Sequence, residues 1–119
     1  MRDIQFILER WGVWSRHRYE MDYSNIAAGF KGLLMEESGA LSCSDNDAMI
    51  IDSCVGRLKR KRPDEYSLIN DFYIKKISKR QLAKSLKCDE KLIRIKLQLA
   101  EGFIEGCLSM LSVNLEMID

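Results

Sequence analysis

The residues best suited to do chemistry lie between Ser78 and Ala100, in the stretch SKRQLAKSLKCDEKLIRIKLQLA. Its charged and polar side chains are mainly cations, with two acids and two amides, and it holds no paired metal ligands. Arg and Lys can donate hydrogen bonds to guanine in the major groove, and Glu can accept one from cytosine. Cations outside the groove contact phosphates. The chemistry that this stretch favours is therefore recognition of nucleic acid.

Two helices joined by a brief turn must position these side chains. Ser78 followed by Gln81 is typical of a capping box, which predicts where the first helix begins. Asp89 can cap the second helix. Lys87 and Cys88 lie between the two and predict the turn.

The apolar residues of this stretch predict a helix–turn–helix over about 78–100. A small residue, Ala83, occupies the expected crossing point, and the inner faces comprise Leu82, Leu86, Cys88, Ile93 and Leu97. Two residues depart from the usual pattern. Lys87 stands where such turns usually have glycine, and Lys96 stands where many have an apolar residue. Two ordinary packed helices are the alternative interpretation.

If the motif is real, the second helix enters the major groove with its first outward residues against the bases. The candidates for base contact are Glu90, Lys91, Arg94 and Gln98. The candidates for phosphate contact in this stretch are Lys79, Arg80, Lys84 and Lys87. For each of them a solvated charged face is the alternative, because exposed helix faces are normally charged.

A second group of cations ends a helix that the sequence predicts from Asp45 to about Arg60, after N-cap candidates that begin at Ser44. Its members are Arg57, Lys59, Arg60, Lys61 and Arg62. Cations suit a helix C-terminus. Five of them within six residues exceed that need, so a phosphate-contacting patch is an equal alternative.

The distribution of charge supports a polyanionic partner. The net charge of the 119 residues is only +1. Residues 1–56 hold five basic and nine acidic groups, and 97–119 hold four acids without Lys or Arg, so each flank is net −4. Residues 57–96 hold fourteen basic and five acidic groups, net +9. Such asymmetry points to nucleic acid as the partner of the middle.

The remaining elements predict an all-α fold in one domain over 1–119. Asp3 can cap a first helix with an apolar stripe, in which Trp11 and Trp14 either face the core or anchor a protein interface. A short helix is expected over 23–37, and Pro63 starts another that ends near Lys75 and Lys76. An acidic amphipathic helix over about 101–117 closes the chain, with core packing or subunit contact as its role.

Other classes of protein fit the sequence poorly. The four cysteines form no CxxC pair, so we expect no metal and no cofactor. The longest uncharged stretch, Gly106–Leu115, is far shorter than the ~20 residues of a membrane span. His17 has no Cys or Ser beside it, and no hydrolase, P-loop or metalloprotease motif occurs, so we expect no enzyme.

Five phrases together resemble the phage antitermination protein Q family, of the lambdoid phage and prophage type. They are MRDIQFILERWGVW, IAAGFKGL, DNDAMI, LAKSLKCDEKLIRIKLQLAEGFIEG and the closing LEMID. The resemblance covers nearly the whole chain in one order. Other branches of the family carry a zinc-binding insert with paired cysteines, which this chain lacks, so the resemblance does not extend to zinc.

The resemblance implies a transcription antitermination factor that acts in late gene expression, in the cytoplasm of a bacterial host. Such proteins bind double-stranded DNA near the late promoter and engage RNA polymerase paused there with its sigma factor. The modified polymerase then reads through terminators, because a ring of the bound factor narrows the RNA exit channel. The helix–turn–helix would be similar to the sigma-factor domain that reads the upstream promoter element. Nascent RNA, and a second copy of the chain on the DNA, are further partners that the resemblance allows.

This resemblance suggests roles for the charged segments. The basic middle would contact DNA, and the acidic flanks, including Glu9, Glu101 and Glu105, would contact polymerase. Trp11 and Trp14 are the candidate aromatic residues for polymerase contact. One alternative function is a helix–turn–helix transcriptional regulator that acts at initiation only. Another is a helical adaptor without a DNA role, for which the basic segment would be a solvated face.

Overall fold

The protein, described here from a computed structural model, is built from helices. The structure describes residues 3–23, 41–111 and 115–116. Its helices are α1 (Ile4–Tyr23), α3 (Asp45–Lys61), α4 (Pro63–Ile69), α5 (Lys79–Leu86) and α6 (Glu90–Met110), with a π-helical segment η2 (Asn70–Ile74). Within these ranges no strand occurs, so the predicted all-α class is confirmed. The helix predicted over 23–37 lies outside the described residues, except that Tyr23 ends α1.

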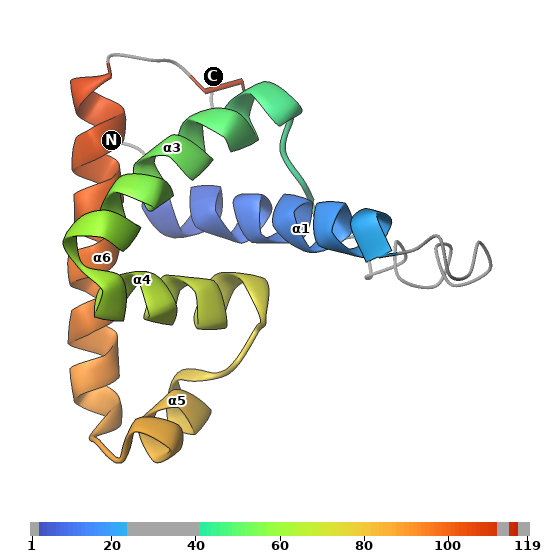
Figure 1. Ribbon diagram of the computed structural model, residues 1–119. Helices are drawn as coiled ribbons and strands as arrows, with labels where there is room; N and C mark the ends of the chain where they lie inside the picture. The colour runs from blue at the N-terminus through green and yellow to red at the C-terminus, as the bar shows by residue number, and fades with distance from the viewer. Residues whose placement is uncertain (1–2, 24–40, 112–114, 117–119) are drawn as a thin grey trace.

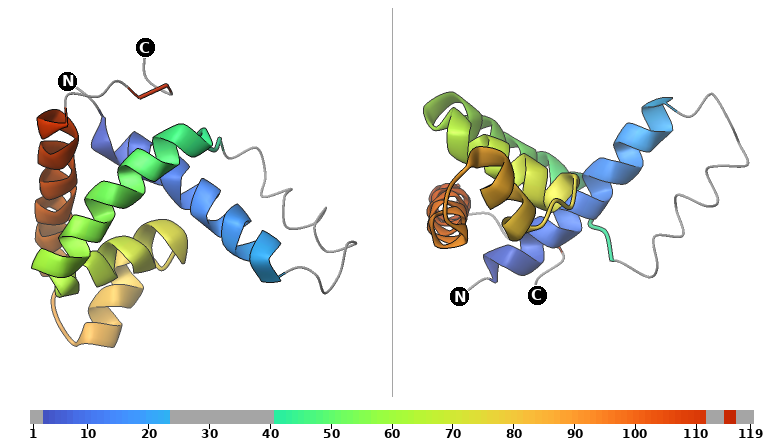
Figure 2. Two further views of the ribbon diagram at one scale, coloured as in Figure 1. Left: turned by 45° about the horizontal axis from the view of Figure 1, so that its top comes forward. Right: turned by 90° about the horizontal axis from the view of Figure 1, so that it is seen from below.

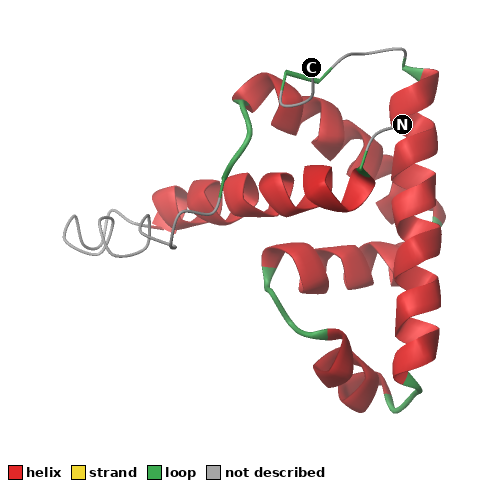
Figure 3. Ribbon diagram, turned by 180° about the vertical axis from the view of Figure 1, so that it is seen from behind, coloured by secondary structure: helices red, strands yellow, loops and turns green. Residues whose placement is uncertain are grey.

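The longest helix, α6, runs the height of the molecule, and the other helices pack against it. Figure 1 shows α1, α4 and α5 extending from one side of α6, while the end of α3 crosses over α6, and the view from behind in Figure 3 agrees. Seen from below in Figure 2, α6 is end-on at the rim of the assembly. The long helix therefore has one face toward the other helices and one face away from them.

Local signals in the sequence explain where three helices begin. The Ser44 hydroxyl accepts a hydrogen bond from the Asp47 backbone N–H at 3.2 Å, which caps α3 as predicted. Pro63 is the first residue of α4, where its missing N–H costs nothing. The Ser78 hydroxyl accepts from the Gln81 backbone N–H at 3.1 Å and starts α5.

The first helix, α1, runs through the polar stretch around His17 without a break to Tyr23. One predicted helix boundary was wrong. The two helices expected on either side of residue 100 are one helix, α6, which ends at Met110 rather than near 117. The alanine at 100 is fully buried, so packing against the core continues through this point.

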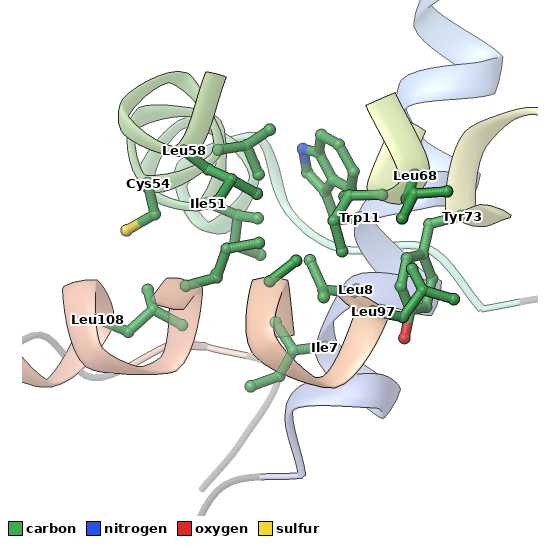
Figure 4. Close-up of a cluster of buried hydrophobic side chains, with 14 of the residues drawn as sticks. Ile7, Leu8, Trp11, Ile51, Cys54, Leu58, Leu68, Tyr73, Leu97 and Leu108 are labelled. Carbon is green, nitrogen blue, oxygen red and sulfur yellow. The ribbon is translucent and has the colours of Figure 1, made fainter. Parts of the chain in front are cut away.

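The core lies between the inner face of α6 and the helices that cover it. Figure 4 shows side chains of α1, α3 and α4 converging on α6. Trp11, Ile93 and Leu97, which the sequence placed on apolar or inner faces, are in the core. The core also includes Ile7, Leu8, Ile51, Cys54, Val55 and Leu58. Leu86, predicted to be internal, is 57% exposed. It is the last residue of α5, beside a first turn of α6 that is itself exposed.

A buried polar contact ties three segments together at Glu101. Its carboxylate accepts a hydrogen bond from the Tyr73 hydroxyl at 2.7 Å and one from the Gln5 amide at 3.4 Å. Burial, and then the hydrogen bond to Glu101, raise the pKa of the Tyr73 hydroxyl, which stays protonated as the donor. Glu101 is 6% exposed. The expectation that it contacts polymerase was therefore wrong, because its partners are internal.

A second constraint is the close approach of α1 to η2. A Cβ atom added at Gly12 would overlap the carbonyl oxygen of Tyr73. Further along α1, the Arg16 guanidinium donates to the carbonyls of Tyr73 and Ile74 at 2.9 and 3.1 Å. These carbonyls belong to the end of the π-helical segment, where backbone acceptors need partners outside the helix.

Replacing Gly12 with alanine should lower the free energy of unfolding by at least about 1 kcal/mol, because overpacking outweighs the better helix propensity of alanine. Gly56, which has nothing within 4 Å of an added Cβ, provides the control. Gly56→Ala should leave stability unchanged or raise it by up to about 1 kcal/mol. Urea denaturation measures both, and equal effects of the two variants would contradict the close contact.

Tyr73→Phe should destabilise the protein by about 1–3 kcal/mol, because the Glu101 carboxylate loses its principal buried donor. Tyr66→Phe is the matched control, since that ring is half-buried and its described contact is between the ring and Lys59. Thermal unfolding monitored by circular dichroism compares them. A Tyr73→Phe variant as stable as Tyr66→Phe would show that the carboxylate does not depend on this hydroxyl.

Candidate nucleic-acid interface

The connection between α5 and α6 is a tight left-handed turn. Lys87 has φ 54° and ψ 49°, the left-handed conformation that glycine adopts with the least steric strain. The Cys88 N–H donates to the Ala83 carbonyl at 3.0 Å, and the Lys87 N–H donates to the Lys84 carbonyl at 3.3 Å. These two bonds satisfy the last carbonyls of α5 in the pattern of a Schellman motif. The turn is thus well formed although a lysine occupies its special position.

The start of α6 follows at once. The Asp89 carbonyl accepts from the backbone N–H groups of Leu92 and Ile93, but its side chain makes no capping bond, contrary to the role expected of it. Leu82, Ala83 and Ile93 are buried between the two helices, as predicted. The opposite side of this helix pair faces solvent.

The four candidates for base contact are all exposed at the start of α6. Glu90, Lys91, Arg94 and Gln98 are exposed to solvent there, and no described ion pair engages any of them. The arrangement provides donors and one acceptor on a helix whose other face is fixed in the core. Such a surface can enter a groove that accepts a helix.

The phosphate candidates of α5 and its turn surround this surface unevenly. Arg80, Lys84 and Lys87 are exposed. Lys79 is half-buried, with its ammonium 5.3 Å from the centroid of the Phe72 ring. We call these four residues the α5 cations. They lie on the element that packs directly against the first half of α6.

The second predicted group, Arg57, Lys59, Arg60, Lys61 and Arg62, lies elsewhere, at the end of α3. We call these five the α3 cations. Several of them border a hollow of about 580 Å³ that also touches Phe103 and Cys107, in the second half of α6. Arg62 pairs with Glu65 at 2.9 Å, and the Lys59 ammonium lies 5.3 Å from the Tyr66 ring centroid. The fold therefore divides the basic middle of the sequence into two surfaces.

Sequence reasoning missed other cations that the fold places at the surface. Lys76 is exposed with φ 59°, and Lys96 is half-buried on α6. Lys76 also borders a hollow of about 570 Å³ between α1 and η2, which includes Arg10 and Arg16. Single lysines form no recognisable motif in the sequence. Arg10 and Arg16 lie some 60 residues before Lys76, so the sequence does not show that they share a surface. The net positive charge of residues 57–96 was the only signal for the lysines.

The two tryptophans have different environments. Trp11 is 3% exposed, and its indole N–H donates to Asp52 at 2.6 Å, so it is a core residue with almost no surface for a partner. Trp14 is half-buried. Its indole donates to Asp45 at 2.8 Å, and the Arg18 guanidinium lies 5.2 Å from its ring centroid. Of the two, only Trp14 offers a contact area.

The cysteines form no site within the described chain. No cluster of three or more His, Cys, Asp or Glu that could hold a metal occurs among the described residues. None of the four cysteines forms a disulfide within the described chain, and Cys54 is buried. Burial, with smaller contributions from nearby carboxylates such as Asp47, raises the pKa of the Cys43 thiol to about 11, so it is a poor nucleophile at neutral pH. No described helix is long and apolar enough to cross a membrane.

Replacing Lys87 with glycine should stabilise the protein by about 0.5–1 kcal/mol, because glycine adopts φ > 0 without a Cβ clash. Lys87→Ala removes the same charge but keeps the Cβ, so it should bring no such gain. Chemical denaturation of both variants separates the backbone effect from the charge effect. A gain of equal size in both would attribute it to charge.

Comparisons with known proteins agree with one another. The sequence profile described as phage antitermination protein Q matches residues 1–116. A probable antitermination protein Q from Acyrthosiphon pisum secondary endosymbiont phage 1 is 56% identical in an alignment of 119 positions, which covers 98% of this chain and 80% of that protein. The prophage antitermination protein Q homolog QuuD of Escherichia coli (strain K12) is 44% identical, with 98% and 94% covered.

The antitermination protein Q of Escherichia phage 933W is also 44% identical, with 98% of this chain and 83% of that protein covered. No solved structure matches. The match extends over nearly the whole chain, from α1 through the cation-bearing helices to the end of α6. The chain therefore belongs to the phage antitermination protein Q family.

Proposed function

We propose that this chain is a transcription antitermination factor that binds a DNA element near a phage late promoter through α5 and α6. It then loads onto RNA polymerase paused there and lets it read through terminators by narrowing the RNA exit channel. Membership of the antitermination protein Q family supports the general role. The observation that carries the DNA step is the exposed start of α6, held in place by a buried opposite face.

In this proposal α6 contacts the bases and the α5 cations contact the phosphates. Arg94 and Lys91 donate to base edges, and Glu90 accepts, because they project from the first turns of α6. Gln98, one turn further on, reaches the edge of the same groove. The α5 cations contact phosphates and fix the register of the helix on the duplex. A helix pair of this kind would bind the duplex in the way that the sigma-factor domain binds the upstream promoter element.

The α3 cations contact a second stretch of nucleic acid. They are separated from the α5 cations by the fold, and their hollow includes the aromatic ring of Phe103. Duplex DNA beyond the first site or nascent RNA leaving the polymerase supplies the phosphates for this surface. An aromatic ring beside cations also suits unpaired bases, which can stack on it.

The surface that contacts polymerase in this proposal is on α1, away from the α3 and α5 cations. Trp14 offers part of its ring beside Asp45, and Glu9 is exposed on the same helix, α1. Both belong to the N-terminal flank, which is net −4. A charge of this sign complements the basic surfaces of a nucleic-acid-binding enzyme. Glu101 is excluded from this role by its burial.

The central experiment is terminator read-through by purified polymerase. The protein should raise read-through only on templates that carry its DNA element. Addition after polymerase has left the promoter region should have no effect, whereas addition at the pause should. Equal read-through without the element contradicts the proposal. A change in initiation alone, with no read-through, indicates a regulator that acts by occupying the promoter.

Arg94→Ala should weaken binding to the element by about 1–3 kcal/mol and relax specificity at one base position. Lys84→Ala should weaken binding to all sequences alike and lower the salt dependence by about one counterion. Lys75→Ala, which removes a cation already paired with Asp71 at 3.6 Å, should have little effect. Fluorescence anisotropy against a set of single-base variants of the element, at several salt concentrations, measures all three.

A uniform loss of affinity for Arg94→Ala would show that α6 does not read bases through this residue. Equal losses for Lys75→Ala and Lys84→Ala would show that only the net charge matters. In either case the read-through assay still reports whether the chain is an antitermination factor.

A further inference from the structure

The outward side of α6 carries an apolar stripe that nothing in the described chain covers. Its residues alternate at intervals of three and four, the spacing of a helix–helix seam: Leu92, Ile95, Leu99, Gly102, Gly106 and Ser109. We call them the α6 stripe. Leu92, Ile95 and Leu99 are 40%, 44% and 56% exposed. The residues of α6 that are buried in the core, such as Ile93, Leu97 and Ile104, lie on the opposite face of the helix.

The space beside the two glycines of the stripe is empty. A Cβ atom added at Gly102 or Gly106 would meet nothing within 4 Å. By contrast, the space beside Gly12 is filled by the neighbouring η2. The first half of the stripe therefore projects large apolar side chains, while the second half offers a smooth backbone surface against which such side chains can pack.

We propose that the α6 stripe packs antiparallel against the α6 stripe of a second copy of this chain. With the two-fold axis at the level between residues 100 and 101, Leu99 meets Gly102 of the other copy. Ile95 then meets Gly106, and Leu92 meets Ser109. Every layer joins one large and one small residue, so one register makes all of them complementary. A parallel pair would instead set Leu99 on Leu99 and Gly102 on Gly102, so the first half of the seam would be crowded and the second half empty.

The charges beside the stripe favour the same orientation. Lys91, Arg94 and Lys96 lie in the first half of α6, and no Lys or Arg follows. The second half carries Glu101, which is buried, and Glu105. An antiparallel pair sets the basic half of each helix beside the cation-free half of the other. A parallel pair would place like charges side by side, at a cost.

The occupant that fits is therefore a second copy, because the surface is complementary to itself under a two-fold rotation. The contact runs from Leu92 to Ser109, about 27 Å of helix at 1.5 Å per residue. A single helix pair of this length is small, so we expect a weak dimer that dissociates on dilution. Of the candidates for base contact, Arg94 lies on a neighbouring side of α6, whereas Lys91 and Gln98 border the α6 stripe, and the inference does not depend on their role.

Sedimentation velocity on the full chain, from about 1 μM to about 500 μM, should show a monomer–dimer equilibrium. Gly102→Leu should weaken dimerisation about tenfold or more, because the introduced leucine side chain would collide with Leu99 of the other copy. The fold should survive, since the added side chain points into open space, and circular dichroism checks that helix content is kept. Gly56→Leu, the same change on α3, is the matched control and should leave the dimer unchanged.

The decisive variant combines Leu99→Gly with Gly102→Leu. It exchanges the large and small residues of the central layer and leaves the composition unchanged, so dimerisation should return to within about threefold of the original. Failure of this exchange to restore the dimer overturns the antiparallel register. A chain that stays monomeric at every concentration overturns the proposal. If Gly102→Leu then also abolishes read-through, the stripe belongs to a different protein partner.

Discussion

The burial of one face of α6 is the constraint on which the rest of the structure depends. Ile93, Leu97, Ile104 and Leu108 are almost fully buried along it, and each of the other helices except α5 meets this face over its middle or second half. Apolar burial of this extent is the main favourable term in the stability of a small domain. Because α6 is one continuous helix, contacts made near its end also fix the direction of its start. The exposed residues proposed to read DNA are therefore positioned by the core rather than by a flexible loop.

Much of this fold follows from local signals in the sequence. Ser44, Pro63 and Ser78 each start a helix for reasons that involve only their nearest neighbours along the chain. The apolar spacing of α3 identifies its buried residues for the same reason, since helical periodicity is a local property. The turn at Lys87 was also placed correctly, although its residue type argued against it.

What the sequence could not supply were contacts between distant residues. Glu101 looks like a surface acid in an acidic segment until Tyr73 and Gln5 are brought to it by the fold. Trp11 has a polar partner, Asp52, that lies 41 residues away. The division of the cations into two surfaces has the same origin: α3 and α5 are close in sequence, but α4 and η2 intervene and carry α5 to the other end of α6.

The contact between Gly12 and the Tyr73 carbonyl bears on how such a chain can diverge. Any side chain at position 12 requires η2 to shift, and η2 also holds the hydroxyl that satisfies Glu101 and carbonyls that satisfy Arg16. A functional replacement of Gly12 would therefore require several compensating substitutions at the same time, which a single mutation does not provide. We expect this glycine to be retained even where the DNA sequence read by the exposed start of α6 changes.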